Sequence, residues 1–376
     1  MSKKYYKNTP NNIITNEITN RILKNNDASI FHTSLDEYIP TSLISLPSLS
    51  KKYGVENIYI KDESLRFGLK AFKVLGASYA LFQCLQNNPA IETFCTATDG
   101  NHGRAVAWSA KKFGKSAVIF VPKDTTINRI RLIESDGAMV IKINGNYDEA
   151  CQQAEKLSKI NNWTLIQDMA WEGYEEIPAF IMAGYLTLFK ELEDSLHTNP
   201  KPKIDIVFLQ AGVGSLAGAG IYYYLNKYGN NRPKIVIVEP EEADPILFSF
   251  KRNKISTTEG NCTTIMAGLN CGTPSTGAWN LIKNGADYSV KISDKYAKQA
   301  MRELYYPTNT DKRIISGESG VGGLAGFLAI MNENSLKTVR QSLNIGPNTN
   351  ILFISTEGDT DEQVFEQIIN EKINEE

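Results

Sequence analysis

Two kinds of segment alternate along the chain and limit the folds that it can adopt. Short apolar runs rich in β-branched residues are typical of strands that are buried on both faces of a parallel sheet, and the amphipathic stretches between them are typical of crossover helices. Strands are expected at 57–60, 93–98, 117–121, 139–143, 164–167, 204–210, 234–239 and 351–355, and helices at 76–86, 101–113, 128–136, 147–161 and 179–193. The alternation predicts an α/β fold.

The length of 376 residues predicts two domains, because a domain takes roughly 150 residues. The polar segment 197–203, which carries two prolines, is the best linker candidate. The 40 Lys and Arg residues are balanced by 42 Asp and Glu residues. Nucleic-acid binding normally requires a cationic excess, so no nucleic-acid partner is expected.

The chain gives no sign of a membrane segment or of a metal site. No stretch approaches the roughly 18 apolar residues of a membrane span, and the first residues are too polar for a signal peptide. The five cysteines form no CxxC pair, and the three histidines are far apart. We therefore expect a cytoplasmic protein with no membrane partner, no disulfide framework and no metal.

A glycine-rich loop follows the strand expected at 204–210. Glycines at 212, 214, 218 and 220 allow the backbone to approach a ligand closely, and a helix that starts there offers unpaired N–H groups to an anion. Gly212, Gly214 and Ala217 also fit the G-x-G-x-x-A pattern of dinucleotide sites, with Glu239 at the end of the next strand. The loop predicts a phosphate cradle but leaves a dinucleotide, a smaller phosphate ester and a simple packing turn open.

Lys73 lies in an apolar run between Phe72 and Val74. An ammonium group that loses hydration there is expected to have a lowered pKa, and a deprotonated amine is what a Schiff base with an aldehyde requires. The alternative is a lysine whose charged end reaches out of a helix into solvent. Lys70, three residues earlier, is the rival candidate and is expected to be more exposed.

These two features occur together with other segments in a familiar order. Asp62-Glu-Ser64, Ala71-Phe-Lys-Val-Leu-Gly-Ala77, Asp99-Gly-Asn-His-Gly103 and the loop at 211–220 resemble the fold-type-II pyridoxal-phosphate enzymes of the tryptophan synthase β and threonine dehydratase group. The resemblance covers roughly residues 40–361. It implies a large parallel-sheet domain of residues 1–89 and 169–376 that binds pyridoxal 5'-phosphate, a smaller inserted α/β domain of residues 90–168, and a homodimer.

The resemblance also implies roles for individual residues. In that group a lysine matching Lys73 holds the cofactor as an internal aldimine, and an asparagine matching Asn101 contacts its phenolic oxygen. A hydroxyl residue meets the pyridine nitrogen, which implies Thr356, with Ser355 as the fallback. The phosphate is bound by the glycine loop, which maps to Gly212, Val213, Gly214, Ser215 and Leu216.

Within the group, the segments 66–73, 96–104, 167–178, 264–269 and 355–361 are most similar to the diaminopropionate ammonia-lyases. This similarity implies β-elimination of 2,3-diaminopropionate to pyruvate and two ammonia, with Asp99 and Asp168 in the site. We expect Gly100, Asn101 and His102 to receive the substrate carboxylate, Asp99 to be a second base, and Asp168 to hold the β-ammonium. The plainer interpretations are a helix cap for Asp99 and a loop contact for Asp168.

Alternatives of other kinds stay open at this point. A serine or threonine dehydratase would use the same cofactor and Lys73, but the pair of aspartates favours an amine substrate. An NAD-dependent oxidoreductase would be built around Gly212 and Glu239. A non-catalytic scaffold would not need Lys73, Asn101 and the loop together. Trp171, Tyr174 and Pro178 are expected to pack the wall of the cleft, and Glu318 could serve the site or only the fold.

Overall fold

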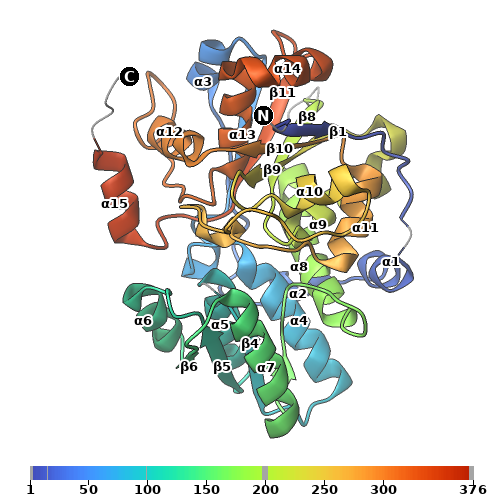
Figure 1. Cartoon of the computed structure of the whole chain (residues 1–376), viewed down its shortest axis with the longest axis vertical. Coiled ribbons are helices and arrows are strands. Elements are labelled where there is room, and N and C mark those ends of the chain that lie inside the picture. The colour runs from blue at the N-terminus through green and yellow to red at the C-terminus, as the bar shows by residue number, and fades with distance from the viewer. Residues whose placement is uncertain (1–2, 15, 99, 197–201, 372–376) are drawn as a thin grey trace.

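The computed structural model describes residues 3–14, 16–98, 100–196 and 202–371, which form two sheets (Figure 1). The five inner strands of the larger sheet are parallel, and the short strands at its two edges pair antiparallel with their neighbours. Its order is β1 (Tyr5–Lys7), β10 (Tyr288–Ile292), β9 (Lys234–Pro240), β8 (Ile206–Gln210), β11 (Asn350–Ser355), β3 (Asn57–Asp62) and β2 (Leu43–Ser45).

The smaller sheet lies in the lower part of Figure 1 and is parallel throughout. Its order is β6 (Met139–Lys142), β5 (Ser116–Val121), β4 (Thr93–Ala97) and β7 (Thr164–Leu165). All four strands fall inside the segment that was expected to form the inserted domain. The boundaries of that domain at residues 90 and 168 stay a prediction.

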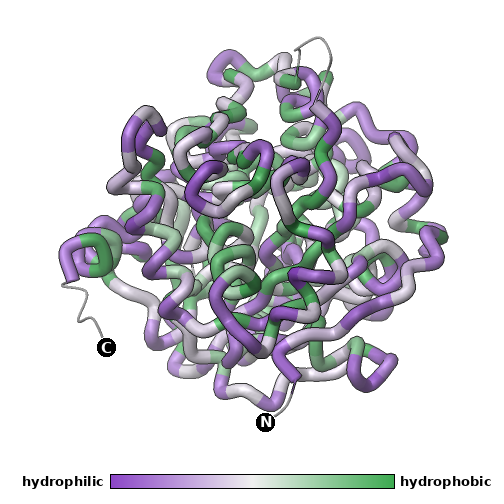
Figure 2. Tube along the Cα trace, turned by 90° about the horizontal axis from the view of Figure 1, so that it is seen from above, coloured by the Kyte–Doolittle hydropathy of each residue, from purple (hydrophilic) through white to green (hydrophobic). Residues whose placement is uncertain are grey.

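Helices cover both sheets. They are α1 (Glu17–Lys24), α2 (Ala28–Thr33), α3 (Pro47–Tyr53), α4 (Lys73–Asn87), α5 (Asn101–Lys112), α6 (Ile127–Ser135), α7 (Tyr147–Asn161), α8 (Glu176–Ser195), α9 (Ser215–Tyr228), α10 (Pro245–Arg252), α11 (Thr276–Gly285), α12 (Asp294–Tyr305), α13 (Gly322–Asn332), α14 (Lys337–Leu343) and α15 (Glu362–Asn370), with short 3₁₀ turns η1 (Arg66–Gly68), η2 (Gly229–Asn231), η3 (Ala267–Leu269) and η4 (Asn334–Leu336). Strand β8 shows why two layers are needed: Val207 and Leu209 face one hydrophobic core, and Ile206 and Phe208 face another. The apolar segments accordingly gather inside the molecule in Figure 2.

The expected strands agree with those observed, although the one expected at 164–167 is only two residues long. Strands β1, β2 and β10 were not predicted. Helix α4 begins at Lys73, three residues before its expected start. Of the proposed linker, residues 197–201 lie outside the described part of the chain.

The order of the large sheet fixes where a ligand can bind. From β8 the chain passes through α9 to β9 on one side, whereas β11 pairs with β8 on the other side. Ligands of open parallel sheets bind at such a switch point, outside the carboxyl ends of the strands. The glycine loop after β8 and Thr356 after β11 therefore meet at one edge of the sheet.

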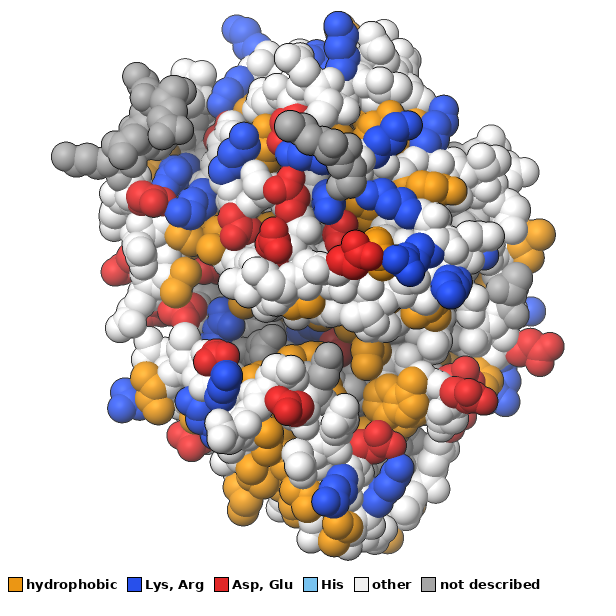
Figure 3. All heavy atoms as spheres, in the orientation of Figure 1, with side chains coloured by type: hydrophobic (Ala, Val, Ile, Leu, Met, Phe, Trp, Pro, Cys, Tyr) orange, Lys and Arg blue, Asp and Glu red, His pale blue; other side chains and the backbone are white. Residues whose placement is uncertain are grey.

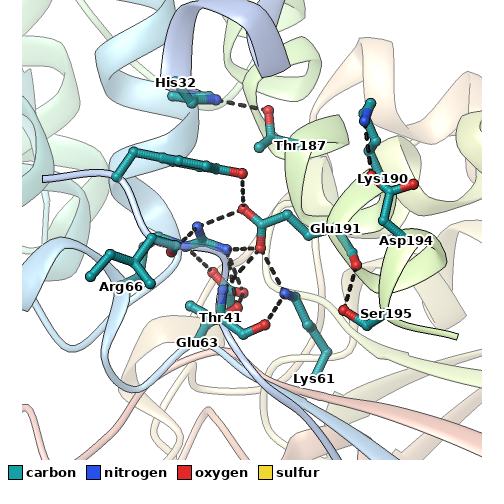
Figure 4. Close-up of polar contacts among 12 residues, drawn as sticks. His32, Thr41, Lys61, Glu63, Arg66, Thr187, Lys190, Glu191, Asp194 and Ser195 are labelled. Atoms are coloured by element: carbon teal, nitrogen blue, oxygen red, sulfur yellow. Dashed lines mark hydrogen bonds and ion pairs between the residues drawn. The ribbon is translucent and has the colours of Figure 1, made fainter. Parts of the chain in front are cut away.

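A buried cluster of charges joins β3 and η1 to α8 (Figure 4). The Arg66 guanidinium is bound to both Glu63, at 2.7 Å, and Glu191, at 2.6 Å, and the ammonium of Lys61 lies 2.7 Å from Glu191. The hydroxyl of Tyr38 also donates a hydrogen bond to Glu191. The two positive and two negative side chains balance one another, which is the condition under which charges can be buried at tolerable cost.

Helix α4, which begins with Lys73, packs unusually close to α8. A Cβ atom added at Gly184 would overlap the carbonyl oxygen of Leu75, and one added at Gly76 would lie 2.5 Å from the ring of Tyr185. Glycine at these two positions allows the two helix backbones to touch. The start of α4 is thereby held against a helix that the charge cluster also anchors.

No helix in the described ranges combines the length and apolar character needed to cross a membrane.

Candidate active site

A cleft opens between the two sheets, at the carboxyl ends of β8 and β11. Figure 3 shows this face of the molecule hollowed between its upper and lower parts. The expected site residues that line the cleft are Lys73, Gly100, Asn101, His102, Asp168, Gly212, Val213, Gly214, Ser215, Leu216 and Thr356. Asp99 lies outside the described residues. Segments from five distant parts of the chain therefore meet in one cleft.

Lys73 forms an ion pair inside this cleft. Its Nζ lies 2.5 Å from Oδ2 of Asp168 and 5.5 Å from the centre of the Phe72 ring, and its side chain is 19% exposed. The expected lowering of the Lys73 pKa is wrong. Burial does lower this pKa, but the Asp168 carboxylate raises it by more, so the amine is held as an ammonium.

Asp168 follows β7, and a hydrogen bond to its backbone holds it in place. Its carbonyl oxygen accepts a hydrogen bond of 2.7 Å from the hydroxyl of Ser215, the first residue of α9. Burial raises the pKa of Asp168, but Lys73 and, to a smaller extent, His102 lower it to about 2. The pair is therefore fully charged at neutral pH and is attached to the glycine loop.

The glycine loop has the geometry of an anion cradle. Gly214 has a φ of +97°, in the left-handed region that favours glycine, and it directly precedes α9. A Cβ atom at Gly212 would lie 2.9 Å from Sγ of Cys271, so no larger residue fits. The first N–H groups of α9 have no intrahelical partner, and the helix dipole adds positive potential there.

Thr356 lies beside the loop and is oriented by Gln210. The Nε2 group of Gln210 lies within 3.2 Å of the Thr356 hydroxyl and also faces the carbonyl oxygens of Gly320 and Ile354. Carbonyl oxygens only accept hydrogen bonds, so the Gln210 amide must turn its Nε2 donor toward them. The Thr356 oxygen, on the same side, is then also an acceptor for Nε2. The Thr356 proton is thereby left for an acceptor in the cleft. The fallback, Ser355, instead donates to the hydroxyl of Ser316, away from the cleft.

The start of α5 forms the opposite wall. The Asn101 side-chain amide donates to the carboxylate of Glu357. His102 lies with Nε2 2.8 Å from the carbonyl oxygen of Ile166, which fixes the proton on Nε2, and its buried Nδ1 has no protein partner. Burial lowers the pKa of His102, so this ring is neutral.

Other residues singled out in the sequence lie outside the cleft lining. Trp171 and Tyr174 stack on each other with ring centres 4.3 Å apart, and Pro178 is buried in α8. Glu318 is buried with an unpartnered Oε1, and burial, followed by the nearby Glu357, raises its pKa to about 7. Lys70 is 36% exposed and is paired with Asp359 and Glu362.

Glu239 does not reach the cleft, which argues against a dinucleotide site. Its fully buried carboxylate accepts hydrogen bonds from the backbone N–H groups of Ile246 and Leu247, at the start of α10. Burial raises its pKa to about 8. A side chain enclosed in this way is not available to a ribose. Among the described residues, no cluster of three His, Cys, Asp or Glu side chains is suited to a metal ion.

Several cleft residues were not predicted from the sequence, namely Gln210, Glu357, Arg104, Arg129 and Tyr147. Glu357 directly follows Thr356, so its position was a usable signal. Gln210 ends a strand that continues into the glycine loop, and the same argument would have found it. Arg129 and Tyr147 are brought to the cleft by helices of the smaller sheet, and nothing in their local sequence marks them.

Comparison with known proteins identifies relatives over almost the whole chain. A sequence profile of the family described as "Pyridoxal-phosphate dependent enzyme" matches residues 35–355. The diaminopropionate ammonia-lyase of Salmonella typhimurium is 39% identical over 363 residues, which cover 90% of each protein. The crystal structure of the Escherichia coli diaminopropionate ammonia-lyase, in complex with an aminoacrylate-PLP azomethine reaction intermediate, matches with a TM-score of 0.90 and 36% identity over 97% of this chain and 96% of that one. Threonine deaminase isoform 2 of Solanum lycopersicum, at 21% identity and a TM-score of 0.78 over 98% of this chain and 97% of that one, shares the fold.

Proposed function

The chain belongs to the family of pyridoxal-phosphate-dependent enzymes, and from that membership we propose that it is a diaminopropionate ammonia-lyase. The reaction removes the α-proton and the β-amine of 2,3-diaminopropionate, and hydrolysis of the remainder gives pyruvate and a second ammonia. The observation that carries this proposal is the Lys73–Asp168 ion pair, which places an amine and a carboxylate together beside a phosphate cradle.

The residues of the cleft fit pyridoxal 5'-phosphate. The N–H groups at the start of α9 would hold the phosphate, Asn101 would contact the phenolic oxygen, and the Thr356 hydroxyl would donate to the ring nitrogen. The amine of Lys73 would bind the aldehyde covalently. When bound, the cofactor ring takes up the negative charge left at the substrate Cα. Because Thr356 is a neutral donor, it leaves the ring nitrogen largely unprotonated, which favours prompt elimination over transamination.

Asp168 suits a substrate with two amino groups. Its pKa of about 2 keeps it anionic, so it attracts the β-ammonium once Lys73 has released its charge. The β-nitrogen leaves as neutral ammonia, so it must be protonated as an ammonium before the C–N bond breaks. The Asp168 carboxylate can stabilise this ammonium and hold it in place. A serine hydroxyl carries no positive charge and could only donate a hydrogen bond to this carboxylate. Asp99 is proposed as the base on the opposite face.

The substrate assignment is tested by pyruvate formation from the purified, cofactor-loaded protein. We expect kcat/KM to be at least about 10²-fold higher for 2,3-diaminopropionate than for serine, since an ion pair in a shielded site is worth several kcal/mol in discrimination. A preference for serine or threonine would assign the dehydratase function instead.

Replacing Asp168 by Asn should separate its effect on the Lys73 pKa from its effect on substrate turnover. Loss of the carboxylate removes the main group that raises the Lys73 pKa, so the effect of burial is opposed less and that pKa falls. Uptake of the cofactor aldehyde by the unloaded protein should accordingly reach its maximal rate at lower pH than in the wild type. Turnover of diaminopropionate should fall about 10²-fold or more. An unchanged pH profile of cofactor uptake would contradict the electrostatic role of Asp168.

The oligomeric state and the location of the protein are also proposals. A homodimer is expected from the resemblance to the family, and sedimentation of the loaded protein tests it. A cytoplasmic location is expected from the reducing environment that the cysteine pattern suggests, and cell fractionation tests it.

A further inference from the structure

We propose that Glu357 is a positioning residue of this site, which fixes the side-chain amide of Asn101 so that it presents an N–H group to the ligand in the cleft. The inference rests on the proposed function and names a residue on which the reaction would depend. Glu357 follows Thr356 at the end of β11, and its side chain is buried in the wall of the cleft.

The carboxylate of Glu357 is divided between two neutral donors. Oε2 accepts the amide N–H of Asn101, and Oε1 accepts the backbone N–H of Ser319 at 3.0 Å. Neither contact is a cation, so both are hydrogen bonds from neutral N–H groups to a carboxylate. Such charge-assisted hydrogen bonds are roughly twice as strong as those between neutral groups.

The backbone of Glu357 cannot shift to release these contacts. Its carbonyl oxygen accepts the N–H of Gly317 at 3.0 Å, and a Cβ atom added at Gly320 would lie 2.5 Å from the same oxygen. On its other side Glu357 forms an isolated β-bridge with Ala71, two residues before Lys73. The carboxylate is therefore held in register with the segment that carries the reactive amine.

A fixed acceptor decides which end of the Asn101 amide faces it. A carboxylate cannot donate, so only Nδ2 can contact Glu357, and Nδ2 keeps a second N–H for a ligand in the cleft. Without the carboxylate, a rotation of 180° would exchange the donor for Oδ1 at little cost. Asn101 belongs to α5, on the side of the smaller sheet, whereas Glu357 follows β11 of the larger sheet. Their hydrogen bond therefore connects the two walls of the cleft and fixes the position of the amide between them.

The test is a double-mutant cycle on the cofactor-loaded protein. Glu357→Gln keeps the shape but offers one oxygen to two N–H donors, so we expect kcat to fall about 10- to 100-fold, as misplacement of a site group does. KM should change less than kcat, and the absorption maximum of the bound cofactor should shift. In an Asn101→Ala background the same substitution should change neither kcat nor the absorption maximum further. Glu362→Gln, an exposed acid five residues along, is the matched control and should leave both unchanged.

An equal further loss from Glu357→Gln in the Asn101→Ala background would overturn the proposal, because Glu357 would then act independently of Asn101. Should Glu357→Gln fold poorly, Glu357→Asp keeps the charge and shortens the side chain, and the same cycle applies. If even the wild type forms no pyruvate from diaminopropionate, the proposed function fails. The shift of the cofactor absorption and its dependence on Asn101 still decide the role of Glu357.

Discussion

Lys73→Ala is expected to lower the rate of pyruvate formation from diaminopropionate by at least about 10³-fold, the scale of loss when the residue that forms the covalent bond is removed. The cofactor should also be lost from the variant on dialysis, because only non-covalent contacts with the phosphate cradle, Asn101 and Thr356 would hold it. Lys73→Arg should lower the rate of pyruvate formation to the same degree. A guanidinium keeps the ion pair with Asp168, but it stays protonated and therefore cannot act as a nucleophile.

Lys70→Ala is the matched control for this prediction. Lys70 lies three residues earlier, is partly exposed, and pairs with Asp359 at 2.9 Å and Glu362 at 3.0 Å. Exposed ion pairs contribute little, so activity within about twofold of the wild type is expected. Retention of the dialysis-resistant cofactor by Lys73→Ala, or its loss from Lys70→Ala, would place the reactive amine elsewhere.

Glu191→Ala is expected to reduce the free energy of unfolding by about 3–5 kcal/mol, the cost of leaving buried charges without their partner. Glu191 is the shared partner of Arg66 and Lys61 (Figure 4), and all three side chains are buried. Without it, two cations would face Glu63 alone. Urea unfolding followed by circular dichroism measures the difference. Asp194→Ala, which breaks an exposed pair with Lys190 on the same helix, should change stability by no more than about 0.5 kcal/mol.

The pH dependence of this effect has a defined sign. Burial raises the pKa of Glu191, but Arg66 and Lys61 lower it to about 2. A carboxyl whose pKa is lowered on folding contributes stability above its unfolded pKa and loses it as the pH falls through the folded value. The difference between the wild type and Glu191→Ala should therefore be constant near neutral pH and shrink between about pH 4.5 and 2. A difference that grows in acid would contradict the assigned charge state.

The fold could be predicted from the sequence where strands are buried on both faces. The runs that become β8, β9 and β11 have continuous apolar middles that include β-branched residues, so their own composition marks them. Strands β1 and β2 have three residues each and are defined by pairing with β10 and β3, which no local pattern records. In strand β10 the polar residues Ser289 and Lys291 alternate with apolar ones, and this pattern is a weaker signal than a continuous apolar run.

The described residues that were expected in the site do line one cleft, but the charge states within it were not predicted. The expectation for the Lys73 pKa used only its sequence neighbours, which are apolar. The group that reverses the shift is Asp168, 95 residues later, and the fold brings the two within 2.5 Å. Glu239 shows the converse: its place after a glycine loop suggested a ribose contact, but tertiary packing encloses it at the start of α10.

The central claim is that the amine of Lys73 carries the cofactor. Reduction of the loaded protein with borohydride, followed by peptide mass spectrometry, tests it most directly, because hydride fixes the bond between the lysine and the aldehyde. The account predicts that the added mass lies on the peptide containing Lys73 and on no other lysine peptide. Finding that mass on another lysine, or on none, would contradict it.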